Sequence, residues 1–250
     1  MQLLKLSIVT VLILVISIFP ITGIGHASKI NKDQETLLYF NEYADKIYTM
    51  IGDTDLSLEI FHTALKGYLR LKEKKLITND VLSIVDYSKS CNQKRFFAID
   101  LRLKKVIYKS LIAHGRNSGG TYASNFSNKM SSMQSSLGFF ITGEKFNGQH
   151  GYSLRLDGVE RNINDKARER GIVIHAADYV SEEFVNKYGR LGRSQGCPAL
   201  PNNLANSIID LIKDKSCFFV YYPDRKYLRK SSFINQTAYS SRELAFLAAE

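Results

Sequence analysis

One cysteine of this chain lies in a setting that is unusual for a structural thiol. Cys197 stands between Gly196 and Pro198 in the segment GRLGRSQGCPALPNN, residues 189–203. Glycine permits backbone angles that other residues resist, and proline is favoured at the first position of a helix. We therefore expect a sharp turn that places Cys197 at the N-terminus of a helix, where the dipole lowers a thiol pKa. The N–H groups of Gly196 and Cys197 could then stabilise an oxyanion.

A thiolate nucleophile needs a general base, and His175 is the best candidate. It ends the apolar segment IVIHAAD, 22 residues before Cys197. A histidine on an apolar strand is by itself equally compatible with a core residue, but its pairing with Cys197 favours catalysis. Asp178 follows three residues later and would face the opposite side of a strand, so a Cys-His-Asp triad is not favoured.

The other histidines and cysteines carry weaker signals. His114 and His150 lie in glycine-flanked loops, where we expect structural roles, with His150 the better candidate for substrate binding. Cys91 and Cys217 are either inert thiols or a disulfide pair, and in both cases Cys197 is left without a disulfide partner. No HExxH, HxH or CxxC motif is present, so neither a metal nor another cofactor is expected.

The surrounding elements follow from hydrophobic periodicity. Apolar residues three and four apart predict two helices between residues 33 and 75, separated by GDTD with Thr54 or Asp55 as N-cap, and then a polar connection over 76–94. From Arg95 on, the predicted strands are RFFAIDL, KVIYKSLIAHG, LGFFITG, YSLRLDG, GIVIHAAD and CFFVYYP. A short helix over 164–170 and an amphipathic helix in LPNNLANSIIDLIK are also expected. The fold class is therefore α+β, mainly β.

These elements divide the 250 residues into four parts. Residues 1–27 have a basic start, an apolar run and small residues before the predicted cut, which is typical of a signal peptide; an uncleaved anchor is the alternative. Residues 28–94 form a helical region, 95–223 a catalytic domain and 224–250 a polar tail that ends in a possible helix, RELAFLAAE. We expect export to the periplasm or cell envelope, with membrane contact only through the signal segment.

The formal net charge of +10 would draw an exported protein to anionic polymers such as a cell wall. Nucleic acid is the other common partner of basic chains, but no standard nucleic-acid-binding signature is present.

Several separated blocks resemble the murein L,D-transpeptidase catalytic domain, the YkuD-type fold. They are AHGRNSGG, SSLGFFITGE, GQHGYSLRLDGVE and IVIHAADYV followed by GRLGRSQGCPAL, and the resemblance covers roughly residues 95–223. The family signature, a histidine and then Ser/Thr-x-Gly-Cys, is matched by His175, Ser194, Gly196 and Cys197. The resemblance implies a β-sandwich with a helix after Cys197, preceded by the helical pair. It also implies that Cys197 attacks a peptide carbonyl, that His175 takes its proton, and that the Ala176 carbonyl orients the ring.

The chain departs from the family pattern beside the cysteine. Most members have histidine where this chain has Gln195, and many have a branched residue and then Arg or Asn where it has Pro198 and Ala199. A backbone N–H at Gln195 could still join the oxyanion donors, but substrate recognition would differ. Arg193 could bind a substrate carboxylate, although a solvated arginine is equally compatible. The predicted substrate-binding residues are Ser194, Gln195, Arg193 and His150.

The resemblance implies acyl transfer on peptidoglycan stem peptides. Cys197 would expel a terminal D-amino acid and pass the acyl group to the side-chain amine of a neighbouring stem. Water as acceptor would make the protein an L,D-carboxypeptidase, because the two reactions share every catalytic residue. A non-catalytic module that binds the wall and a secreted cysteine protease are the competing hypotheses.

Overall fold

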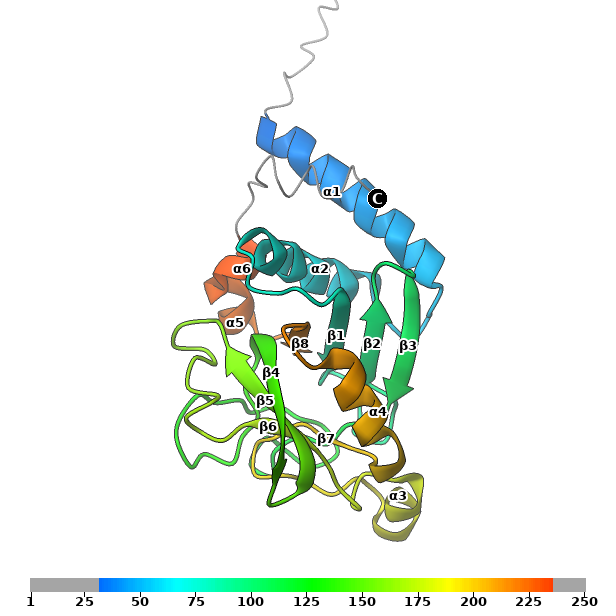
Figure 1. The fold of residues 1–250 in the computed structure, drawn as a ribbon, viewed down its shortest axis with the longest axis vertical. Helices are drawn as coiled ribbons and strands as arrows, with labels where there is room; N and C mark the ends of the chain where they lie inside the picture. Colours follow the sequence, from blue (N-terminus) through cyan, green and yellow to red (C-terminus); the bar gives the residue numbers. More distant parts are fainter. Residues whose placement is uncertain (1–31, 236–250) are drawn as a thin grey trace, which may run out of the picture. The chain divides into compact units, whose positions relative to one another are not determined.

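The computed structural model of the chain describes residues 32–235. The predicted signal segment and the predicted helix in RELAFLAAE lie outside the described residues. Two helices come first, as the apolar spacing predicts: α1 (Lys32–Ile51) and α2 (Leu58–Glu73), which pack against each other (Figure 1). The N-cap of α2 is Ser57, so the prediction of Thr54 or Asp55 is wrong. Asp53 and Asp55 instead bind the ammonium group of Lys109.

Eight strands form one mixed sheet in the order β3-β2-β1-β8-β4-β5-β6-β7 within the described residues. Neighbours are antiparallel except for β1 with β8 and β6 with β7, which run parallel. With the helices, this sheet confirms the expected α+β, mainly β, fold. The strands are β1 (Val81–Asp86), β2 (Phe96–Asp100), β3 (Lys105–Ser110), β4 (Gly138–Gly148), β5 (Gly151–Gly158), β6 (Val173–Ala176), β7 (Ala199–Leu200) and β8 (Cys217–Tyr221).

The polar connection predicted over residues 76–94 is wrong, because it contains β1. All six residues of β1 are buried, and the strand lies between β2 and β8. A strand that is buried on both faces has no alternation of polar and apolar residues, so its periodicity gives no signal. The sheet therefore extends toward the N-terminus beyond residue 95.

The short helix predicted over residues 164–170 is also wrong, since this segment is a series of turns. The side chain of Asn164 donates to the carbonyls of Leu137 and Phe139 and accepts from the Glu160 N–H. These bonds tie the segment to the start of β4. Three short helices were not predicted: α3 (Glu182–Tyr188), and in the tail α5 (Arg225–Lys230) and α6 (Ser232–Asn235).

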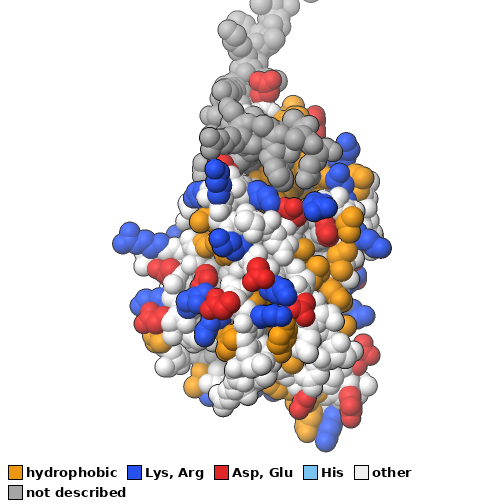
Figure 2. Space-filling view, viewed as in Figure 1, with side chains coloured by type: hydrophobic (Ala, Val, Ile, Leu, Met, Phe, Trp, Pro, Cys, Tyr) orange, Lys and Arg blue, Asp and Glu red, His pale blue; other side chains and the backbone are white. Residues whose placement is uncertain are grey.

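Aromatic side chains of adjacent strands form much of the core. Phe139 of β4 stacks on Phe219 of β8 and lies directly against Gly67 of α2. The predicted amphipathic helix is α4 (Asn202–Ile212), and it contacts β1, β5 and β6. On the face seen in Figure 2, basic and acidic side chains are interspersed. None of the helices within residues 32–235 has the length and apolar content that a bilayer crossing needs.

Candidate active site

Cys197 does not lie at the mouth of a helix. The segment that follows Cys197 first forms β7, in which Ala199 pairs with His175 of β6. Helix α4 begins only at Asn202, with Pro201 as its N-cap. The prediction of Pro198 as the first helical residue is therefore wrong. The cause is non-local, because pairing with β6 and a further bridge from Ala113 hold this segment extended.

Gly196 has the special backbone conformation that the sequence predicts. Its φ is +125°, and an added Cβ would lie 2.9 Å from the carbonyl oxygen of Gln134. Its N–H donates to Oγ of Ser194 at 3.1 Å. This group is therefore not free to bind an oxyanion, contrary to the prediction. Within the described residues, no hydrogen bond occupies the N–H of Gln195 or of Cys197. These two groups are therefore the candidate oxyanion donors.

Ser194 holds the turn around Cys197 through its hydrogen bonds. Its hydroxyl accepts from Gly196 and donates to the Cys197 carbonyl at 2.5 Å, while its own N–H donates to the His114 carbonyl. The side chain is buried and its bonds are internal to the protein. Its contacts therefore fit a positioning role, and substrate binding by Ser194 stays a prediction.

His175 is held by β6 with one ring nitrogen available. Its Nδ1 lies 2.8 Å from the carbonyl oxygen of Ala176, in the arrangement that the resemblance implies for Ala176. A carbonyl can only accept, so the proton of the neutral ring is on Nδ1 and Nε2 is the basic nitrogen. No hydrogen bond within residues 32–235 occupies Nε2. Burial lowers the pKa of His175, the Ala176 carbonyl opposes that shift, and His150 adds to it.

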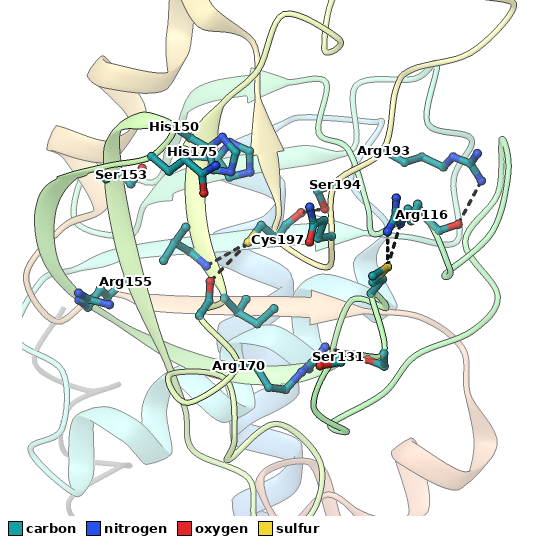
Figure 3. A pocket seen from close by; sticks show the side chains of 18 of the residues that line it. Arg116, Ser131, His150, Ser153, Arg155, Arg170, His175, Arg193, Ser194 and Cys197 are labelled. Carbon is teal, nitrogen blue, oxygen red and sulfur yellow. Dashed lines mark hydrogen bonds between the residues drawn. The ribbon is translucent and has the colours of Figure 1, made fainter.

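The Cys197 thiol rests beside backbone groups. Its Sγ lies 3.5 Å from the Val173 nitrogen and 3.7 Å from the Gly171 carbonyl oxygen (Figure 3). Burial raises the pKa of this thiol, and the Val173 N–H and the Arg170 charge only partly oppose the shift. The lowered pKa expected from a helix dipole is therefore wrong. At neutral pH the resting pair is a thiol and a neutral imidazole, a state suited to general-base catalysis.

Cys197 and His175 line one pocket of about 630 Å³. Its walls come from the β4–β5 hairpin, the start of β6, the cysteine turn and the loop around residues 130–133. The side chains that line it include no aspartate or glutamate. They do include four arginines, which favour an anionic ligand: Arg116, Arg155, Arg170 and Arg193.

The other predicted substrate-binding residues lie around this pocket in different ways. Gln195 is exposed at its edge. The Arg193 guanidinium points away from Cys197 and donates to the carbonyls of Arg116 and Gly119, so its role as a carboxylate clamp stays a prediction (Figure 3). His150 is exposed, and its ring stacks on His175 with centroids 4.4 Å apart and planes at 22°.

Arg170 is a site residue that the sequence analysis missed. Its guanidinium donates to the carbonyls of Ser127 and Gln134, both at 2.7 Å, and to the hydroxyls of Ser132 and Ser136. It thereby fixes the loop that forms one wall of the pocket, and its charge acts on Cys197. It lies in a polar segment that carries several arginines, so no local pattern distinguishes it.

The remaining candidates lie outside the reacting centre. His114 is buried with its Nδ1 2.8 Å from the guanidinium of Arg95, and burial lowers its pKa to about 4, which fits the structural role expected for it. Asp178 lies in the turn after β6, where it is exposed and accepts from the Asn202 side chain. Cys91 and Cys217 are free thiols with exposed fractions of 1% and 0%, so they do not pair. The part of the chain that the structure describes holds no cluster of metal-binding side chains.

The Cys197 thiol, the His175 imidazole and a pocket lined by arginines form a candidate site for cysteine acyl transfer. A family model for the L,D-transpeptidase catalytic domain matches residues 53–221. The chain belongs to this family. The match begins in the turn between α1 and α2 and includes β1. None of the curated proteins matches the sequence.

The chain is similar to several solved structures, three of which follow. The L,D-transpeptidase from Mycobacterium smegmatis is 15% identical over 57% of this chain and 59% of its own, with a TM-score of 0.36. A variant of Enterococcus faecium L,D-transpeptidase is 14% identical over 57% and 50%, with a TM-score of 0.36. The helical cell shape determining protein of Campylobacter jejuni is 19% identical over 75% and 57%, with a TM-score of 0.36. The chain thus spans about half to three fifths of these proteins.

Proposed function

We propose that this protein catalyses L,D-transpeptidation of peptidoglycan stem peptides in the cell envelope. The observation that carries the proposal is the opening of Cys197 and the unoccupied Nε2 of His175 into one pocket. Family membership supports the same reaction class. The four arginines suit a peptide that carries several carboxylates. The signal-like composition of residues 1–27 agrees with an envelope location.

The first half-reaction begins from the neutral pair. Sγ of Cys197 turns from the Gly171 carbonyl toward His175, gives its proton to Nε2 and attacks the carbonyl carbon at the L-centre of a diamino acid. The N–H groups of Gln195 and Cys197 bind the oxyanion. The C–N bond then breaks, and His175 returns the proton to the leaving D-amino acid. The product is a thioester on Cys197.

The second half-reaction transfers the acyl group. The neutral side-chain amine of a neighbouring stem attacks the thioester carbon and gives one proton to Nε2 of His175, the C–S bond breaks, and the departing Cys197 sulfur takes that proton from His175. The products are a cross-linked dimer and the free enzyme. Attack by water would instead release a trimmed stem peptide.

The test combines purified stem-peptide fragments with the protein and determines product masses. Dimers that lack the donor's terminal residue are the expected result, and trimmed monomers alone would assign hydrolysis in place of transfer. Cys197→Ala should abolish both products. His175→Gln should slow thioester formation at least about 100-fold, the low end of the contribution of a positioned base.

Cys91→Ala is the matched control, because it also removes one thiol but lies outside the pocket. Turnover that survives Cys197→Ala would refute the enzymatic proposal. Binding of wall fragments without any product from the wild-type protein would favour the non-catalytic module.

A further inference from the structure

The second imidazole of the pocket stands at the tip of a hairpin. β4 and β5 are joined by a two-residue turn, Gln149 and His150, because Gly148 pairs with Gly151. Ser153 of β5 pairs with His175 of β6, so the hairpin tip lies beside the base. Figure 3 shows the rings of His150 and His175 together above Cys197. His150 is exposed, whereas His175 is buried with an exposed fraction of 3%.

The acceptor half-reaction needs two proton acceptors when the acceptor is an alkylammonium ion. The thioester and R–NH₃⁺ give an amide, a thiol and one free proton. One proton must leave nitrogen before it can attack, because an ammonium nitrogen has no lone pair. A second leaves as the C–N bond forms and ends on the thiol sulfur. Hydrolysis by water needs only the second transfer.

His175 can serve only one of these transfers. Its Nδ1 is bound to the Ala176 carbonyl, and its Nε2 must carry the proton that returns to sulfur. Its pKa is lowered by burial, which makes it a poor acceptor for the proton of an alkylammonium ion. The buried base is therefore suited to the thiol and poorly suited to a charged amine.

The other side chains that line the pocket do not offer a second base. None is a carboxylate, and its arginines remain protonated at neutral pH. Burial raises the pKa of Tyr179 to about 12, so this phenol stays protonated as well. An imidazole is the side chain whose ordinary pKa lies nearest neutrality. His150 is the remaining candidate.

We propose that His150 is a catalytic residue that removes the first proton from the acceptor ammonium and thereby favours transfer over hydrolysis; this rests on the proposed function. The imidazolium that forms on His150 releases its proton to solvent. The neutral amine then attacks the thioester, its second proton passes to Nε2 of His175, and the departing sulfur takes that proton. One amide bond forms and one C–S bond breaks.

The charges around His150 favour this direction of proton flow. The other titratable groups that line the pocket are His175, Tyr179, Cys197 and the four arginines, of which Arg155 lies on the same hairpin as His150. Arg155 is paired with Glu144 outside the pocket lining, whereas the pocket itself carries net positive charge. A cationic pocket disfavours both a bound ammonium and a lasting imidazolium, so the proton moves from nitrogen to water.

The test compares His150→Phe with Asn147→Ala. Phenylalanine keeps an aromatic ring against His175 and removes both nitrogens. Asn147 is exposed on the same hairpin and does not line the pocket, so its variant is the control. The measurement is the ratio of dimer to trimmed product at neutral pH, first with the stem-peptide amine and then with hydroxylamine, which is uncharged at that pH.

We expect His150→Phe to lower the ratio about 100-fold with the alkylammonium acceptor, in the range of one positioned base. With hydroxylamine the ratio should match that of the control, since no proton has to be removed before attack. An unchanged ratio with the alkylammonium acceptor would overturn the proposal. An equal fall with both acceptors would also overturn it, because that result indicates a structural role.

The mass of the Cys197 thioester separates this proposal from the proposed function. If the wild-type protein forms no thioester, the proposed function is refuted, and the proposed role of His150 is refuted with it. A wild-type protein that forms the thioester and a variant with an unchanged product ratio refute the role of His150 alone.

Discussion

Replacing Arg170 separates the effect of its charge from the effect of its hydrogen bonds. Arg170→Lys keeps the positive charge but loses the planar group that reaches several acceptors at once. Arg170→Met keeps much of the side-chain length and loses both. The wild-type guanidinium donates to the carbonyls of Ser127 and Gln134 and to the hydroxyls of Ser132 and Ser136.

The loss of stability in Arg170→Met depends on which hydrogen-bond acceptor is left without a donor. The Ser127 carbonyl keeps a bond from the Ser136 hydroxyl at 2.7 Å, and serine hydroxyls can turn to other partners. The Gln134 carbonyl has no other donor within the described residues. An unsatisfied acceptor costs about 1–3 kcal/mol when it is buried, and the Gln134 carbonyl is only partly buried, so the low end of this range applies. For Arg170→Met we therefore expect a loss of about 1 kcal/mol, which lowers Tm by roughly 2–4 °C in a domain of this size.

The effect of the Arg170 charge is measured by the rate at which Cys197 is alkylated. The Arg170 charge favours the thiolate, so its removal raises the Cys197 pKa further, and less thiolate is present at a given pH. Iodoacetamide should therefore alkylate Arg170→Met more slowly than the wild type at a mildly alkaline pH. Arg170→Lys should lie between them. Cys91 and Cys217 are buried, so native alkylation reports on Cys197.

Arg161→Met is the matched control, because Arg161 is exposed and does not line the pocket. A wild-type Tm for Arg170→Met would refute the hydrogen-bond argument. An alkylation profile against pH that is the same in Arg170→Met and the wild type would refute the charge argument. The two results are independent of each other.

Three further outcomes are expected. Gly196→Ala should lower the rate of thioester formation at least about 100-fold, because a Cβ 2.9 Å from the Gln134 carbonyl displaces the cysteine turn; an activity assay near that of the wild type would contradict this. Gly67→Ala should lower stability by about 1–3 kcal/mol in a denaturant titration without slowing alkylation, since its Cβ would lie 2.0 Å from the Phe139 ring. The rate of thioester formation should persist into mildly acidic pH and fall only below the lowered pKa of His175, where the base becomes protonated; a fall that begins above about 6.5 would be inconsistent with a buried neutral base.

The parts of the site that sequence could predict are encoded in neighbouring residues. The glycine before Cys197 indicated a turn that only glycine adopts, and its φ of +125° confirms it. The position of His175 at the end of an apolar strand indicated a rigidly held base. Strands such as β5 could be predicted from their content of Phe, Tyr, Ile and Leu and from the glycine-containing or polar stretches that divide them.

The parts that sequence could not predict depend on partners far along the chain. The extended conformation of residues 199–200 comes from pairing with β6, and it overrides the helix-start preference of Pro198. Arg170 acts through a loop more than 30 residues before it in the chain. The Gly196 N–H is occupied because Ser194 folds back on the turn. None of these contacts has a short-range pattern.

The two imidazoles differ in burial in the way that the two half-reactions require. His175 must meet a buried thiol whose pKa is raised, so it has to be fixed close to sulfur and kept neutral, and its strand neighbours and the Ala176 carbonyl provide this. An acceptor amine arrives from water with a proton that must return to water. Only a base in contact with solvent can complete that exchange, and His150 is exposed while its ring still touches His175. The difference in burial between two stacked rings therefore lets one pocket serve a sulfur nucleophile and a charged amine in turn.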